Sequence, residues 1–150
     1  MSSHEDFAKL TYNECWELLG REQLDQDEQR RLQRLSYASL YHWSQVGGPM
    51  EEAIGEWMVS RVHVRLGFSE AALTHAARAV EVVRESQLTG FVVASCFEGL
   101  ARAHAMNGDE QLAIQFRRVA IAELDQIEDA EDRDLIQQQI ADEPWFGIAG

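Results

Sequence analysis

Apolar side chains recur along this chain at helical spacing, and no segment alternates in the two-residue period of a strand. Phe97, Leu100 and His104, for example, lie at i, i+3 and i+7 and share one helical face. The pattern predicts an all-α protein of about seven helices. Their ranges are about 5–19, 27–46, 50–66, 70–87, 91–107, 110–126 and 130–141.

Glycine and polar residues mark where several of these helices end and begin. Gly108 followed by Asp109 is typical of a helix end and the N-cap of the next helix. Gly67 and Ser69 repeat this arrangement earlier in the chain. Pro49, after two glycines, is placed to be the first residue of a helix.

An internal repeat is the strongest signal in the sequence, and its offset is 41 residues. The offset aligns Gly67 with Gly108 and spans both helices of a helical hairpin on either side of that turn. It also pairs Val59 with Leu100, Arg61 with Arg102, His63 with His104, Ala72 with Ala113, and Ala79 with Ala120.

The repeat resembles the tetratricopeptide repeat (TPR) family, which carries an aromatic, a Leu-Gly-like pair, a turn glycine and spaced alanines. The repeat here is 41 residues long, against about 34 in the family. His63 and His104 stand where the family usually has tyrosine. One hairpin carries the pattern as Phe97, Leu100-Ala101, His104, Gly108-Asp109, Ala113-Ile114 and Ala120, and the other as Val59-Ser60, His63, Gly67, Ala72-Leu73, Ala76 and Ala79-Val80.

The resemblance implies a right-handed stack of antiparallel helical hairpins, a TPR-like α-solenoid, that forms one domain over residues 1–150. The run 41–47 is also similar to one in small bacterial TPR-like proteins and brings no activity with it. The expected hairpins cover about 5–46, 50–87 and 91–126, followed by a capping helix and an apolar tail over 130–150.

The amino-acid composition limits the classes of partner that the protein is expected to bind. A net charge of −13 and a pI near 4.7 oppose binding to nucleic acid or to an anionic membrane. Cys15 and Cys96 have no metal-ligand or redox spacing, so we expect buried free thiols in a reducing cytoplasm. No signal peptide and no membrane-spanning run is visible.

In stacked hairpins the first helix of each hairpin lines the concave face, which would then carry two repeat-equivalent arginines, Arg61 and Arg102. Such arginines beside an aromatic ring could hold a carboxylate or an acidic peptide. The alternative is that both arginines form ion pairs with acids such as Glu56 and Glu98. The predicted groove residues are Trp57, Arg61, Arg65, Glu98 and Arg102.

Two further surfaces carry aromatic residues. Tyr41, His42 and Trp43 form either a binding patch or part of the packing between hairpins. The apolar tail with Trp145, Phe146 and Ile148 either folds back over an open end of the stack or docks onto a second subunit as a homodimer.

Enzyme signatures are absent. The five histidines include no His-x3-His or HExxH spacing, so no metal site and no cofactor is predicted. The sequence favours a protein-interaction module that binds a peptide or a partner helix in its groove. The alternatives are a small-molecule or metal-dependent enzyme in a histidine-lined crevice and a self-assembling structural subunit.

Overall fold

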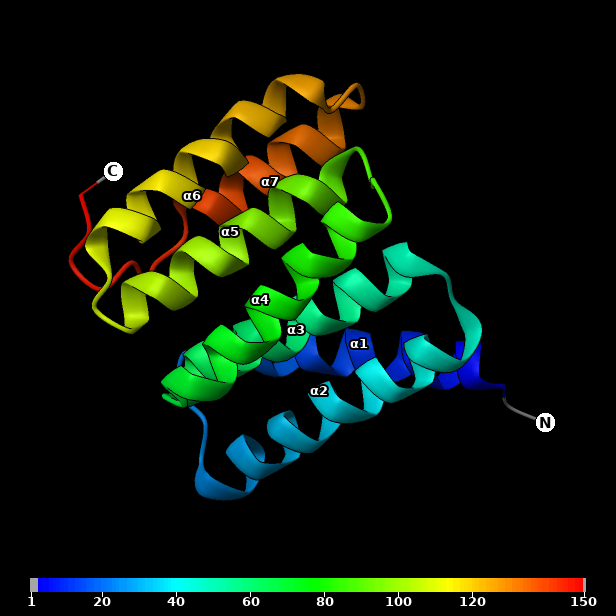
Figure 1. Cartoon of the computed structure of the whole chain (residues 1–150). Coiled ribbons are helices and arrows are strands. Elements are labelled where there is room, and N and C mark those ends of the chain that lie inside the picture. The colour runs from blue at the N-terminus through cyan, green and yellow to red at the C-terminus, as the bar shows by residue number, and fades with distance from the viewer. Residues whose placement is uncertain (1–2, 150) are drawn as a thin grey trace.

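The computed structural model describes residues 3–149. Within that range the regular elements are all helices, and no strand is present. The prediction of an all-α fold with seven helices is confirmed (Figure 1). Predicted and observed bounds agree to within three residues. The helices are α1 (His4–Leu19), α2 (Gln26–Val46), α3 (Pro49–Leu66), α4 (Ser69–Glu85), α5 (Phe91–Met106), α6 (Glu110–Glu123), a 3-10 turn (Leu124–Gln126) and α7 (Ala130–Ala141).

The 41-residue repeat is visible in the turns that end α3 and α5. Gly67 and Gly108 have φ values of 86° and 82°, a left-handed conformation that glycine adopts without a steric penalty. The Asp109 carboxylate accepts a hydrogen bond from the Leu112 N–H at 3.1 Å, as the sequence predicts. Phe68, rather than Ser69, holds the equivalent N-cap place and offers no side-chain cap, so α4 begins one residue earlier than expected.

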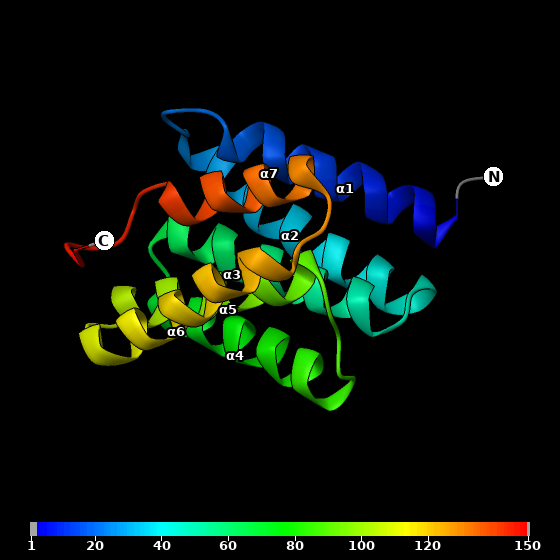
Figure 2. The same ribbon diagram turned by 90° about the horizontal axis from the view of Figure 1, so that it is seen from above.

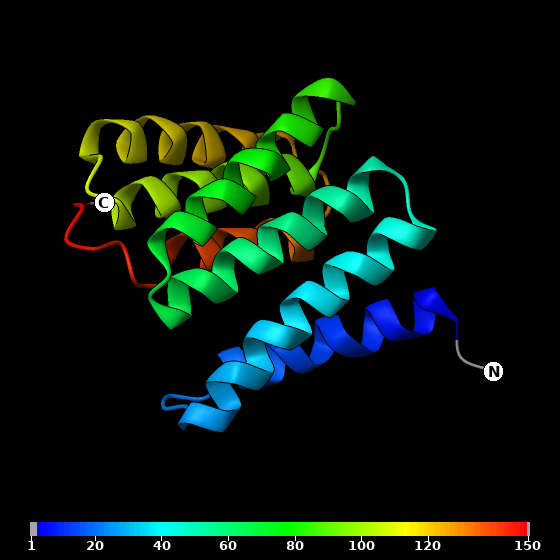
Figure 3. The same ribbon diagram turned by 60° about the horizontal axis from the view of Figure 1, so that its bottom comes forward.

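Consecutive helices pack as three pairs, α1 with α2, α3 with α4 and α5 with α6 (Figures 1 and 3). The pairs contact one another through α2 and α3, α4 and α5, and α3 and α5. The chain then returns in α7, which packs on α5 and α6 and lies on the same side as α1 (Figure 2). Within residues 3–149, every helix falls short of the length or the apolar character that crossing a bilayer demands.

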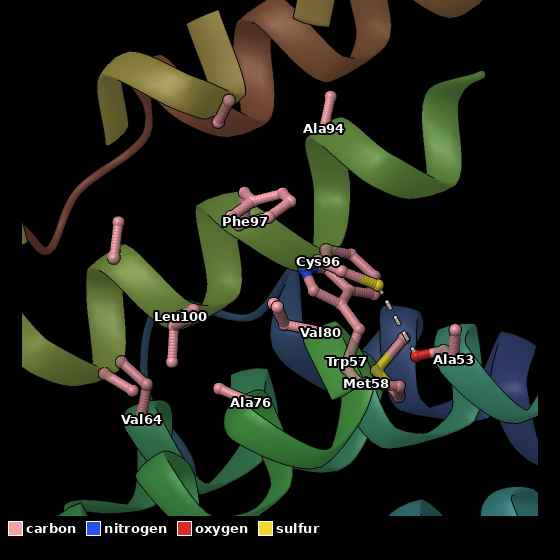
Figure 4. Close-up of a cluster of buried hydrophobic side chains, with 14 of the residues drawn as sticks. Ala53, Trp57, Met58, Val64, Ala76, Val80, Ala94, Cys96, Phe97 and Leu100 are labelled. Carbon is pink, nitrogen blue, oxygen red and sulfur yellow. Dashed lines mark hydrogen bonds between the residues drawn. The ribbon is translucent and has the colours of Figure 1, made fainter. Parts of the chain in front are cut away.

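The core is centred on α3 and α5. Every residue from Val92 to Ala103 is buried, which makes α5 the central helix. Ala53, Trp57 and Met58 of α3 meet the α5 side chains in this cluster, where the Cys96 thiol lies 3.8 Å from the Ala53 carbonyl oxygen (Figure 4). Such a helix is apolar nearly all round because other helices surround it.

Small residues stand where the two helices of a hairpin meet. Ser60 of α3 is buried, and its hydroxyl donates to the Ala72 carbonyl of α4 at 2.8 Å. At the equivalent places in the next hairpin, Ala101 and Ala113 are also fully buried. A larger side chain at these positions would force the paired helices apart.

Gly99 brings α5 close to α3, and a Cβ atom there would lie 2.8 Å from Cδ1 of Trp57. We expect Gly99→Ala to lower the free energy of unfolding in urea by about 1–3 kcal/mol, because the indole is locked in the core. The helix propensity of alanine, about 1 kcal/mol better than glycine, offsets only part of this loss. Gly55→Ala is the matched control, since its Cβ would meet the movable end of Leu40 at 2.9 Å. A loss at Gly55 as large as that at Gly99 would contradict this account.

Candidate functional site

A buried carboxylate joins the two repeat-equivalent arginines. Glu98 and Arg102 are one turn apart on α5, and their side chains are 1% and 2% exposed. Arg61 of α3 donates to Glu98 Oε1 at 2.9 Å, and Arg102 Nε lies 3.6 Å from Glu98 Oε2. One carboxylate therefore balances two guanidinium groups, as the ion-pair alternative has it for Glu98, whereas Glu56 pairs with His75 and, within residues 3–149, not with an arginine.

Arg102 also holds the segment that follows α7. Its Nη1 donates to the carbonyl oxygens of Asp142 and Pro144, both at 2.8 Å, and its Nη2 donates to that of Gln139 at 2.9 Å. Burial lowers the pKa of Arg102, and the charge of Glu98 opposes that shift. The guanidinium remains charged, because arginine does not lose its proton in proteins.

The Trp145 ring is in contact with the guanidinium groups of both Arg102 and Arg117. The Cζ atoms of Arg102 and Arg117 lie 4.2 and 4.7 Å from its ring centroid, and its indole N–H donates to the Ile140 carbonyl at 2.8 Å. Trp145 is 4% exposed and Ile148 is partly buried against the core, whereas Phe146 is 43% exposed. Trp145 and Ile148 of the predicted self-association set thus pack on their own chain.

Of the remaining groove residues, Trp57 lies in the core, and Arg61 and Arg65 are half-buried. Trp57 is 2% exposed and belongs to the core, with its ring centroid 5.8 Å from that of Trp16. The Arg61 Cζ atom lies 5.5 and 5.7 Å from the centroids of Trp16 and Trp57. Arg65 donates to the carbonyl of Leu19 at 3.0 Å and to the carbonyls of Arg21 and Glu22, so it holds the turn after α1.

Arg61, Arg65 and Arg102 border a cavity of about 330 Å³, which we call the arginine pocket. Asp142 stands at its edge, 43% exposed and 3.7 Å from Arg61 Nη2, a contact too long for a hydrogen bond. The pocket combines guanidinium edges with an indole wall, and this combination suits a carboxylate on an apolar stem. The lining residues are Trp16, Leu19, Gly20, Arg61, Val64, Arg65, Arg102, Asp142, Glu143 and Pro144.

Helix α7 covers the neighbouring part of the face that α1, α3 and α5 form. Ile136, Gln139 and Ile140 of α7 are buried there. A small gap of about 180 Å³ remains between α7 and the three helices. The sequence did not predict that a segment of the chain itself would occupy this face.

The predicted aromatic patch lies on α2, near the start of α1. Tyr41 is 55% exposed, while Trp43 is half-buried and its indole N–H has no hydrogen-bond partner within residues 3–149. The Nδ1 atoms of His42 and His4 are 2.8 Å apart, so one of them donates to the other. Tyr41 is therefore the ring that the structure leaves open to solvent.

The histidines are distributed over three places. His42 pairs with His4, His104 stacks on Phe116 with centroids 5.7 Å apart, and His63 stacks on His75 at 6.2 Å. Between residues 3 and 149, no three His, Cys, Asp or Glu side chains are placed to hold a metal ion. Burial raises the pKa of Cys15 to about 12 and raises that of Cys96 as well, so neither thiol is a ready nucleophile.

No protein-family model, curated protein or solved structure matches this chain. The fold itself defines an all-α protein of seven helices, within residues 3–149, that pack against one another.

Glu98→Gln removes the charge that two buried or partly buried arginines share. We expect a loss of about 3–5 kcal/mol in the free energy of unfolding, because one buried cation loses its counter-charge. Asp142→Asn is the control, and its half-exposed side chain should change stability by less than about 1 kcal/mol. Urea unfolding of the three proteins checks this, and equal stability of the two variants would refute the shared-charge account.

Trp145→Ala removes an indole that fills the space between Arg102 and Arg117. A loss of about 3–5 kcal/mol is expected in thermal or urea unfolding, as for other buried tryptophans. Phe146→Ala, one residue along and half-exposed, should cost much less. If the two substitutions cost the same, the tail does not pack in solution as it does here.

Proposed function

We propose that this chain is a TPR-like protein-interaction module that binds an acidic peptide segment or partner helix, with the arginine pocket as the anchor for a carboxylate. The observation that carries the proposal is the pocket itself, about 330 Å³ in volume, with Arg61 and Arg65 at its margin and Trp16 as a wall. Arg65 interacts with backbone carbonyls only and makes no ion pair with the carboxylates of residues 3–149. A ligand carboxylate would supply the missing counter-charge.

Charge complementarity supports an acidic ligand. The whole chain has 13 lysines and arginines against 26 acids, yet this pocket is lined by three arginines and two acids, so its local charge is positive. Asp142 approaches Arg61 without forming a hydrogen bond, so a ligand could take its place at little cost. Arginine is also suited to carboxylate recognition because its planar fork makes two parallel hydrogen bonds.

The C-terminal part of the chain illustrates what this face accepts. Helix α7 places Ile136 and Ile140 against the core, and an acidic residue, Asp142, follows them beside Arg61. An external segment of similar pattern, with apolar residues one turn apart and an acid after them, would have matching chemistry. Such a ligand would bind in the arginine pocket, or it would displace part of α7 from the face that α7 covers.

The TPR-like assignment is supported by the 41-residue repeat and by the order in which the helix pairs contact one another. A cytoplasmic location is part of the proposal. It is supported by Cys15 and Cys96, two buried thiols that remain unpaired within residues 3–149.

A random-peptide library panned on the immobilised chain tests the function, followed by calorimetric titration of the selected peptides. We expect the selected sequences to contain Asp or Glu beside an apolar residue and to bind more weakly as salt increases. Arg61→Lys keeps the charge opposite Glu98 but removes the fork, so it should weaken binding by about tenfold, or 1.4 kcal/mol.

Arg30→Lys is the matched control for this titration, because Arg30 is an exposed arginine of α2 outside the pocket. The affinity of the Arg30→Lys variant for the selected peptides should equal that of the wild type. Peptides that bind all three proteins equally would place binding elsewhere on the surface. Panning that selects no acidic peptide would reject the proposal.

A further inference from the structure

A second cavity, of about 600 Å³, lies between α2 and α4 with the C-terminal end of α3 at its base, and we call it the His–Tyr crevice. It shares no lining residue with the arginine pocket, so its chemistry is independent of the proposed function. Its lining residues are Gln33, Tyr37, His63, Gly67, Phe68, Ser69, Glu70, Ala71, Thr74 and His75.

A chain of two hydrogen bonds leads from a carboxylate to a phenol at this crevice. Glu56 Oε2 lies 2.7 Å from His75 Nδ1, and His75 Nε2 lies 3.2 Å from the Tyr37 hydroxyl. An ionised carboxylate only accepts hydrogen bonds, so Nδ1 carries the proton and Nε2 accepts from the phenol. Three helices contribute one member each, since Tyr37 is on α2, Glu56 on α3 and His75 on α4.

In this series of hydrogen-bonded groups, the Glu56 carboxylate is the most buried and the Tyr37 phenol is the most exposed. The Glu56 and His75 side chains are 12% and 19% exposed, whereas Tyr37 is 41% exposed. The Tyr37 ring packs edge-on against His63 and His75, with centroids 5.3 and 5.4 Å apart, and these contacts fix its orientation. The Tyr37 ring is therefore held in place, and the residue lines the crevice while partly open to solvent.

We propose that Tyr37 is a nucleophile that accepts an acyl group from an activated ester, with His75 as its base and Glu56 as the residue that positions the imidazole. The Tyr37 oxygen attacks the ester carbonyl while its proton moves to His75 Nε2. The bond from the carbonyl carbon to the leaving oxygen breaks, and His75 returns the proton to that oxygen. The products are acylated Tyr37 and a free alcohol, and no further reactant is needed. The arrangement follows the nucleophile, base and orienting-acid logic of covalent catalysis.

The phenol needs a base, because it keeps its own proton near neutral pH. Burial raises the pKa of Tyr37, and the negative charge of Glu56 raises it further. His63, the other histidine of the crevice, is not a competing base. Its Nδ1 donates to the Val59 carbonyl at 2.7 Å, its Nε2 lies 3.2 Å from Gln33 Nε2, and burial lowers its pKa.

Tyr41, one helical turn further along α2, provides an internal comparison. It is 55% exposed, more than Tyr37, and its hydroxyl makes no hydrogen bond within residues 3–149. Exposure alone would therefore make Tyr41 the more reactive phenol. A base bound to the hydroxyl would make Tyr37 the more reactive one.

The test is acetylation of the full chain by 4-nitrophenyl acetate, with the rate at each tyrosine measured by peptide mass spectrometry. Tyr37 should be acetylated about 10²-fold faster than Tyr41, the lower end of what a positioned base contributes. His75→Gln should remove this advantage and leave the rate at Tyr41 unchanged. His42→Gln, a histidine substitution next to Tyr41, should leave the rate at Tyr37 unchanged.

Either of two rate measurements would overturn the proposal. One is equal rates at Tyr37 and Tyr41 in the wild type, and the other is an unchanged Tyr37 rate in His75→Gln. Nitrogen NMR of the wild type gives a readout that needs no variant, since His75 must carry its proton on Nδ1. Glu56→Gln should lower both the fraction of that tautomer and the Tyr37 rate at an unchanged melting temperature. A wild-type His75 protonated on Nε2 alone would reject the relay.

Discussion

The structure depends on one buried carboxylate, Glu98, which sits between two arginines from adjacent hairpins. Removing charges from water is costly, so a nearly inaccessible Glu98 and Arg102 persist only because each charge has a counter-charge and hydrogen-bond partners beside it. Arg61 ties Glu98 to α3 and Trp16, while Arg102 ties it to the residues after α7. The N-terminal and C-terminal parts of the chain are therefore connected through this single ion network.

The same network defines where function can reside. An arginine enclosed by the protein only holds structure, whereas one that borders a cavity is the kind that the proposed function needs. Arg102 belongs to the first kind, whereas Arg61 and Arg65 border the pocket that we propose as the carboxylate site. The His–Tyr crevice is independent of the network and uses α2 and α4, so one small helical scaffold carries two chemically different surfaces.

The sequence predicted the helices well because helix ends depend on local signals such as Pro49, Gly67 and Gly108. The sequence wrongly predicted Ser69 as the N-cap of α4, but the repeat itself gives the correct position, since Phe68 lies 41 residues before Asp109. The different environments of Arg61 and Arg102 were not predictable, because a repeat makes them equivalent. Only the return of the last helix distinguishes the two arginines. It brings Arg102 into contact with Asp142, 40 residues further along the chain, and no periodic pattern in the sequence predicts that contact. Helix packing likewise created the Glu56, His75 and Tyr37 relay from three separate helices.

The carbonyl partners of Arg102 also impose an order of events during synthesis. All three come from residues 139–144, which leave the ribosome long after Arg102 itself. Until then the central helix presents a guanidinium that has its carboxylate but lacks its other acceptors. The three helix pairs can collapse around α3 as they emerge, but the ion network closes only after residues 139–144 have left the ribosome. Closure of the core around Arg102 is in this way tied to the synthesis of a segment about 40 residues downstream.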